Sequence, residues 1–310
     1  MTNKEFYKDY STEDKCLAHF KAAREKEGVA CKKCSGTEHY WLEAKRQFQC
    51  KKCRFRTGIK SGTLFENSKL PIMKWYEAFH FITMSKKPTS AKTIERHLEV
   101  HYETAWFLLH KIRIALGRRN AEYALSGKVE VDECMLSVSD LSEESNVKDH
   151  QKKRGRGASK AKILVMTSFD ERLNKKQELK RIGKSVAMEV IEDFSAETLK
   201  NQMTNWISKN SKIYTDMFQS YKPIKKHFDE IIMKVSSGAL AKEYLPVVHR
   251  MISNMKRNIL AIHHCVSQLH LSNYLAEFCY KLNRKFMLEP GYKGKSIVEN
   301  IVLQAVRFLW

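Results

Sequence analysis

The chain has 310 residues, 43% of them hydrophobic, which is enough for about two or three folded units with a sizeable core. Lys and Arg number 56 against 35 for Asp and Glu, and the formal net charge of +21 indicates a polyanionic partner. Since no apolar run approaches the ~18 residues of a spanning helix, a membrane partner is not expected.

The first 27 residues predict a short helical lead-in. Their apolar side chains recur near the helical period, and residues 11–14, Ser-Thr-Glu-Asp, offer an N-cap. The chain begins with charged residues and lacks the apolar core of a signal peptide, so we expect a cytoplasmic protein. Because the cytoplasm is reducing, disulfides are not expected among the eight cysteines.

Residues 28–60 contain two CxxC pairs. Cys31 and Cys34 are followed, after fifteen intervening residues, by Cys50 and Cys53. Two such pairs that face each other across a hairpin place four thiolates in a tetrahedron, the arrangement of a structural Zn²⁺ site. The sequence therefore predicts a zinc ribbon with hairpin strands at residues 39–42 and 48–49. Its lysines and arginines form either a DNA-facing surface or a solvated basic face.

Residues 61–122 predict a helical unit of the helix-turn-helix type. One helix begins near Pro71, another follows the N-cap Ser90, and the next spans residues 103–113 after a short link. Two helices joined by a tight turn, with basic exposed positions, are typical of motifs whose second helix enters the major groove of DNA. A plain packing bundle gives a similar pattern and is the alternative.

Two short strands carry the candidate catalytic acids. Val129 and Val131 alternate with Glu130 and Asp132, which is the period of a strand with one buried face. Residues 212–216 again close an apolar strand with an acid, Asp216. If the two strands lie side by side, their carboxylates can hold a divalent metal ion for phosphoryl transfer on DNA. The alternative for either aspartate is an ordinary cap or turn residue.

The segments after residue 123 predict an α/β unit that extends to residue 310. Further strands are expected at residues 163–169, 186–191 and 231–235. A helix at residues 195–207 leads into the Asp216 strand, the order of a βαβ crossover. Residues 139–162 are polar and basic, which indicates an exposed loop, and residues 246–283 are mainly helical.

A third ligand is expected from the late helical region, where two candidates compete. His249 and Lys256 are seven residues apart, about two helical turns, so both lie on one helix face. Glu277 is an isolated acid among basic residues, and its alternative role is a salt bridge, for example with Lys281.

The order of these motifs resembles that of the ISXO2-like insertion-sequence transposases of prokaryotes, which are allied to the eukaryotic Merlin elements. The resemblance covers nearly the whole chain. It is carried by the paired CxxC motifs, Ser61-Gly62-Thr63-Leu64-Phe65, residues 90–98, Thr104-Ala105-Trp106, residues 110–113, 129–133 and 214–216, and Tyr274-Leu275-Ala276-Glu277-Phe278 with residues 282–285. The implied fold is α/β, an RNase H-like mixed sheet with flanking helices, preceded by the zinc ribbon and a helix-turn-helix-like domain.

The resemblance also implies catalytic roles. The first two acids of such DDE-type enzymes match Asp132 and Asp216. The family's third residue, followed by a lysine about two turns later, maps best onto His249 with Lys256. His249 departs from the glutamate that gives the DDE pattern its name, and Glu277 lies in a motif that also recurs in the family, so both candidates remain open.

The implied activity is DNA transposition. The ribbon and the helix-turn-helix domain would bind the terminal inverted repeats of a mobile element. The RNase H-like domain would cut the element's end by hydrolysis and join the freed 3′-hydroxyl to target DNA, with Mg²⁺ or Mn²⁺ as catalytic cofactor. We expect double-stranded DNA and further copies of the chain as partners, in the prokaryotic cytoplasm at the nucleoid. The alternatives are a catalytically inactive, transposase-derived DNA-binding protein and a nuclease that does not transpose.

Overall fold

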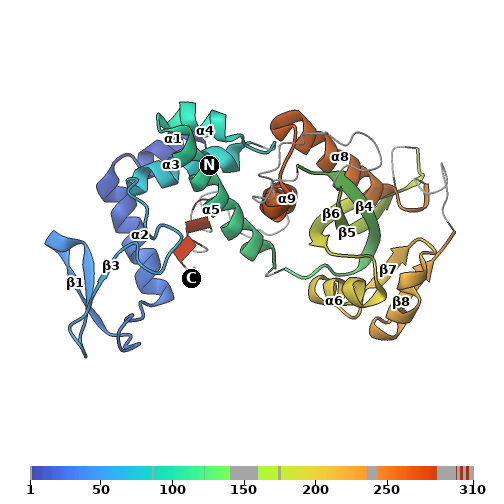
Figure 1. Ribbon diagram of the computed structural model, residues 1–310, viewed down its shortest axis with the longest axis horizontal. Helices are drawn as coiled ribbons and strands as arrows, with labels where there is room; N and C mark the ends of the chain where they lie inside the picture. Colours follow the sequence, from blue (N-terminus) through green and yellow to red (C-terminus); the bar gives the residue numbers. More distant parts are fainter. Residues whose placement is uncertain are drawn as a thin grey trace, which may run out of the picture. The chain divides into compact units, whose positions relative to one another are not determined.

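The computed structural model describes residues 2–85, 87–121, 123–139, 160–173, 176–235 and 243–284, together with 298, 301, 302, 305 and 306. Most of the predicted basic loop at residues 139–162 lies outside them. The chain divides into two compact units, one of Met1–Arg118 with Pro290–Trp310 and one of Arg119–Glu289 (Figure 1).

The first unit begins with the predicted helical lead-in and ribbon. Helices α1 (Asn3–Asp9) and α2 (Glu13–Glu27) start at the N-caps Thr2 and Thr12. Strands β1 (His39–Leu42), β2 (Gln47–Cys50) and β3 (Arg56–Gly58) form an antiparallel sheet, with the turn η1 (Glu43–Lys45) between β1 and β2. The predicted hairpin is therefore present, and β3 extends it.

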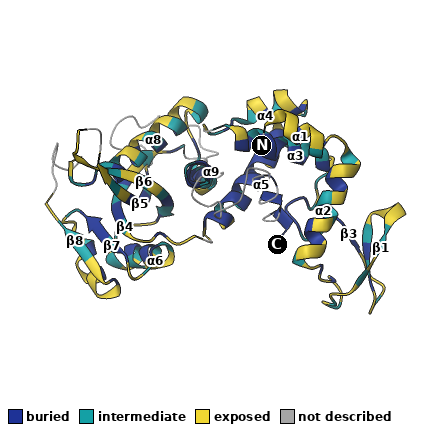
Figure 2. Cartoon of the chain, turned by 180° about the vertical axis from the view of Figure 1, so that it is seen from behind, coloured by how far each residue is buried: buried dark blue, intermediate teal, exposed yellow. Residues whose placement is uncertain are grey.

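Three helices complete the first unit in the predicted order, α3 (Ile72–Met84), α4 (Ala91–Leu98) and α5 (Tyr102–Ala121). Pro71 and Ser90 stand at the N-cap positions of α3 and α4, as expected. Glu99 ends α4 in the left-handed region (φ 53°), which turns the chain sharply into α5. The helices bury Trp75, Phe79, Ile94 and Leu109 completely or almost completely (Figure 2).

Two cations, the buried Arg24 and the half-buried Lys111, join the ribbon to the helices within this unit. Arg24 is 6% exposed and donates to the carbonyl oxygens of Ile59 (2.6 Å) and Ser61 (2.7 Å). Lys111 of α5 donates to the carbonyl oxygens of Leu64 (3.2 Å) and Glu66 (2.8 Å). The segment between the predicted ribbon and the helix-turn-helix domain is thus held by both neighbours, because each cation satisfies buried backbone acceptors.

Some C-terminal residues also belong to the first unit. Val298, Ile301, Val302, Ala305 and Val306 are buried, and the Leu64 amide donates to the Ala305 carbonyl at 2.9 Å. The sequence predicts a single domain over residues 123–310. In the structure Pro290–Trp310 groups instead with the first unit, where these apolar side chains are buried.

The second unit contains a five-stranded sheet in the order β6-β5-β4-β7-β8. Its strands are β4 (Lys128–Ser137), β5 (Lys160–Leu173), β6 (Leu179–Ile191), β7 (Lys212–Thr215) and β8 (Glu230–Met233). β5 pairs antiparallel with both β4 and β6, whereas β4–β7 and β7–β8 are parallel. This mixed sheet is the RNase H-like α/β arrangement expected from the sequence.

Helices cover both faces of this sheet. On one face, α6 (Ala196–Trp206) packs with Val129 and Val131 of β4, near the turns η2 (Gln219–Tyr221) and η3 (Pro223–His227). On the other face, α8 (Pro246–His263) and α9 (Leu271–Asn283) pack with Cys134, and the 3-10 helix η4 (Gln268–His270) directly precedes α9. Since strand residues alternate between faces, Glu130 and Asp132 share the α8 face with Cys134. Among the described residues, no helix combines the length and apolar character needed to cross a bilayer.

Candidate functional site

The two predicted catalytic strands lie side by side. β4 and β7 pair in parallel, with Lys128 opposite Lys212 and Glu130 opposite Tyr214. The pairing ends at Tyr214; Asp216 follows the end of β7, close enough for its charge to raise the pKa of Asp132. The amide of Phe218 donates to Asp216 Oδ1 (3.0 Å) and fixes the turn that follows. The two aspartates thus come from neighbouring strands, and their joint role at a metal site stays a prediction.

The electrostatics of Asp132 reflect this closeness. Burial, and then the negative charge of Asp216, raise the pKa of Asp132 to about 7, and the nearby Lys256 opposes the rise. Each effect has a physical cause: a buried carboxylate loses hydration, and a second carboxylate repels it. The pair is therefore an unfavourable arrangement of charge that a cation would relieve.

Helix α8 brings an imidazole, His249, and a cation, Lys256, close to Asp132. His249 lies in the first turn of α8, and its Nδ1 is 3.4 Å from Asp132 Oδ2. Lys256, two turns further along, is exposed and close enough for its charge to lower the pKa of Asp132. The structure thus brings together Asp132, Asp216, His249 and Lys256.

Glu277, the competing third candidate, has a different environment. It lies on α9 and forms a buried ion pair with Lys281, one helical turn later, with 3.1 Å between Glu277 Oε1 and Lys281 Nζ. The two side chains are 1% and 2% exposed. Breaking such a buried pair would leave an uncompensated charge, whereas His249 faces Asp132.

Glu133 is a site residue whose role the sequence analysis missed. Burial raises the pKa of Glu133 to about 7, and the hydroxyl of the fully buried Tyr221 donates to its Oε1. Because it follows Asp132 on the strand, Glu133 points to the opposite face, towards η2. The acidic pair itself was visible in the sequence, but the tyrosine that holds Glu133 is 88 residues away.

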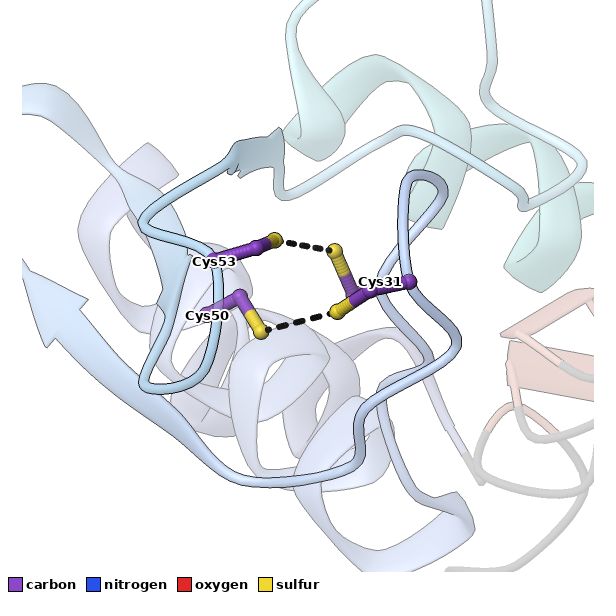
Figure 3. A group of neighbouring side chains, drawn as sticks. Cys31, Cys50 and Cys53 are labelled. Atoms are coloured by element: carbon purple, nitrogen blue, oxygen red, sulfur yellow. Dashed lines mark hydrogen bonds between the residues drawn. The ribbon is translucent and has the colours of Figure 1, made fainter.

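The four predicted zinc ligands also converge. The sulfur atoms of Cys31, Cys34, Cys50 and Cys53 all lie within 4.8 Å of one another, and of the residues described these alone form a metal-ligand cluster of three or more His, Cys, Asp or Glu. Figure 3 shows the thiols of Cys31, Cys50 and Cys53 turned towards a common centre.

Two local features suit this cluster to a metal ion. Hydrogen bonds from backbone N–H groups, first that of Cys53, lower the pKa of Cys50, which favours the thiolate that metals bind. A Cβ at Gly36 would lie 3.3 Å from the Cys50 sulfur and 3.4 Å from the Cys34 sulfur, so a glycine leaves room for the sulfur atoms. The cluster supports a structural zinc site.

Two family models match the chain. A transposase zinc-ribbon domain matches residues 11–56, and an ISXO2-like transposase domain matches residues 124–283, about half of the chain. The chain belongs to the ISXO2-like transposase family. The resemblance seen in the sequence is thereby confirmed. The matched region of this family member contains both aspartates, His249, Lys256 and Glu277.

Individual relatives are more distant. An uncharacterized protein in the transposable element ISH50 of Halobacterium salinarum is 25% identical over 299 residues, covering 89% of this chain and 92% of the relative. A crystal structure of the Mos1 strand transfer complex aligns at a TM-score of 0.33 and 10% identity, covering 76% of this chain and 78% of that chain. A crystal structure of a pre-cleavage Mos1 transpososome aligns at a TM-score of 0.32 and 11% identity, covering 76% of this chain and 79% of that chain. The family assignment rests on the domain matches alone.

Proposed function

We propose that this member of the family is an active transposase that binds the terminal inverted repeats of an insertion sequence, cleaves DNA at the element's ends and transfers the strands into target DNA. The observation that carries the proposal is the meeting of Asp132 and Asp216 on adjacent parallel strands, with His249 3.4 Å from Asp132. Isolated strand-end aspartates are common, but a pair facing an imidazole and a lysine is a metal-site constellation.

The ligand atoms of Asp132, Asp216 and His249 do not all lie within 4.8 Å of one another, so a divalent cation would have to draw them together on binding. Asp132 and Asp216 would be the carboxylate ligands of Mg²⁺ or Mn²⁺, and the charge of the ion would offset their repulsion. His249 would add a nitrogen ligand, which favours a transition metal ion such as Mn²⁺ over Mg²⁺. When bound, such ions activate the attacking oxygen and stabilise the leaving oxygen of a phosphodiester.

The chain's own residues position the DNA around this centre. Lys256 is exposed on the same helix as His249, so it can contact a phosphate next to the scissile bond. Tyr221 keeps the Glu133 carboxyl oriented midway along β4, on the side away from His249. Both faces of β4 therefore carry an acidic side chain at this point of the strand.

The first unit is proposed to recognise the element's ends. Eight cations of the ribbon are exposed and would contact phosphates: Lys32, Lys33, Lys45, Arg46, Lys51, Lys52, Arg54 and Arg56. The α4–turn–α5 segment would place the exposed N-terminal turn of α5 in the major groove. Since two ends must be joined, we propose a homo-oligomer on DNA, which sizing of the protein with end DNA would test.

A cleavage assay on end-bearing duplex DNA tests the proposed chemistry. The variants Asp132→Asn, Asp216→Asn and His249→Ala should each lose at least about 100-fold in rate with Mn²⁺, since even groups behind the ligands are commonly worth 10–100-fold. Asp229→Asn, an exposed acid before β8, is the matched control and should cleave like the wild type. Full activity of either aspartate variant would refute the assignment.

Glu277→Ala separates the two third-ligand candidates. Its folded fraction should cleave with the wild-type dependence on Mn²⁺, although the protein should be less stable because Lys281 loses its buried partner. If instead Glu277→Ala abolishes cleavage in a fully folded protein while His249→Ala does not, Glu277 is the ligand.

A second candidate function is DNA binding without catalysis. The histidine in the third position is the observation that favours it, because a neutral imidazole holds a hard cation less strongly than a carboxylate does. Strand transfer measured with and without Mg²⁺ or Mn²⁺ distinguishes the two functions. Metal-independent end binding with no strand transfer would support the second.

A further inference from the structure

Glu130 is a fully buried carboxylate outside the proposed metal-ligand set. Its Oε2 accepts hydrogen bonds from the backbone N–H groups of Val247 and Val248, both at 2.8 Å, and its Oε1 accepts one from Arg181 at 3.0 Å. Val247 and Val248 are in the first turn of α8. A glutamate on β4 thus caps a helix that begins more than a hundred residues later.

This cap replaces one that the helix itself lacks. No side-chain hydrogen bond from the N-cap residue Leu245 satisfies the first turn of α8, and Pro246 has no N–H to donate. The free N–H groups of a helix start attract an anion, and one carboxylate oxygen of Glu130 accepts from two of them. Glu130 therefore fixes both the position and the direction of the first turn.

Arg181 binds the other carboxylate oxygen of Glu130. We call Glu130 and Arg181, with their contacts to the start of α8, the clamp. The Arg181 guanidinium also donates to the Tyr244 carbonyl at 2.8 Å, just before α8, and lies 4.8 Å from the ring centres of both Phe169 and Tyr214. Side chains of β4, β5 and β7, together with the Tyr244 carbonyl that precedes α8, thus hold Arg181 in place. The buried charge of Glu130 is compensated without any contribution from a metal ion.

The clamp acts on the residue that faces Asp132. Glu130 precedes Asp132 by two residues on the same strand face, and His249 follows Val248 directly on α8. Gly183 of β6 lets the helix approach closely, because a Cβ there would lie 2.9 Å from Val247 Cγ1. One strand therefore holds the start of α8 through Glu130 and presents Asp132 to the histidine of that same turn.

We propose that Glu130 is a positioning residue of the metal site: by anchoring the first turn of α8 it sets His249 against Asp132. This role rests on the proposed function only in that His249 is taken as a ligand. It makes the third ligand depend on a carboxylate that never touches the metal ion.

Mn²⁺ binding to the zinc-loaded, full-length protein tests the role without any cleavage step. Electron paramagnetic resonance measures the Mn²⁺ dissociation constant, and hydrogen exchange measures the opening of residues 247–249. We expect Glu130→Gln, which keeps one acceptor oxygen, to weaken Mn²⁺ binding about 10-fold, and Glu130→Ala to weaken it more. Exchange at the first turn of α8 should accelerate in the same order.

Glu13→Gln is the matched control for lost stability. Glu13 also caps a helix start: its two carboxylate oxygens accept from the N–H groups of Ile72 (2.9 Å) and Met73 (2.8 Å) in α3, next to Pro71, and its side chain is half-buried. This variant should lose stability to a similar degree and keep the wild-type Mn²⁺ affinity, because α3 belongs to the other unit.

The outcomes separate this role from the proposed function. Wild-type Mn²⁺ affinity in both Glu130 variants would overturn the positioning role alone, whereas wild-type affinity in His249→Ala would overturn both this role and His249 as the third ligand. A wild-type protein that binds Mn²⁺ but leaves end DNA intact would refute the proposed activity and leave the role standing. Absence of Mn²⁺ binding by the wild type would overturn the metal site and the role together.

Discussion

Asp132→Asn should stabilise the protein when Mg²⁺ and Mn²⁺ are absent, although it should abolish catalysis. Asp132 is 14% exposed, and its pKa is raised from the ordinary 3.8 to about 7 by burial and by Asp216. Between these two values the folded protein holds a proton that the unfolded chain has released. Stability therefore falls as pH rises from about 4 to about 7, and the loss persists above pH 7. A neutral amide removes this penalty.

The size of the effect follows from the same values. The difference of about three pH units, at about 1.36 kcal/mol each, corresponds to about 4 kcal/mol at pH 8. At pH 5 only part of the penalty has developed, about 2 kcal/mol by the same arithmetic. The stability advantage of the variant should thus grow by about 2 kcal/mol from pH 5 to pH 8. Packing changes caused by the substitution cancel in this comparison because they do not titrate.

Calorimetry of the zinc-loaded protein in Mg²⁺- and Mn²⁺-free buffer measures this difference through the transition of the second unit. Chelators are avoided because they would also remove zinc from the ribbon. Asp229→Asn, an exposed acid of the same unit, should show no comparable pH dependence. A gap between Asp132→Asn and the wild type that stays constant from pH 5 to pH 8 would refute the electrostatic reasoning.

Three further predictions concern the metal sites and the packing of α8 against β6. His249→Glu should improve cleavage with Mg²⁺ relative to Mn²⁺, because it replaces a nitrogen ligand by oxygen; an unchanged Mg²⁺/Mn²⁺ rate ratio would contradict this. Cys50→Ser should unfold the ribbon and abolish binding to end DNA, since structural Zn²⁺ contributes about 10–16 kcal/mol to such folds, while the calorimetric transition of the second unit should remain. Gly183→Ala should destabilise that unit by about 1–3 kcal/mol and weaken Mn²⁺ binding, because α8 must shift; wild-type stability by urea unfolding would show that the helix has room.

The sequence by itself determined the features that local chemistry controls. The spacing of the four cysteines predicts their cluster because each CxxC turn brings two sulfur atoms together. Pro71 and Ser90 mark helix starts because a fixed φ and a side-chain acceptor act on the neighbouring backbone. The valine alternation that ends at Asp132 predicted a strand, and the structure contains β4 there.

The tertiary structure alone decided how distant groups meet. Asp132 and Asp216 are 84 residues apart in sequence, and only the parallel pairing of β4 with β7 brings them close enough for their charges to interact. His249 and Glu277 both lie on helices that pack against the sheet, so helical periodicity could not decide which of the two is the third ligand. The packing of α8 turns His249 towards Asp132, whereas α9 supplies Lys281 as the buried partner of Glu277. Glu130 looked like an ordinary polar position in an alternating strand. Its role depends on N–H groups of a helix start, and these are backbone groups that no side-chain pattern records.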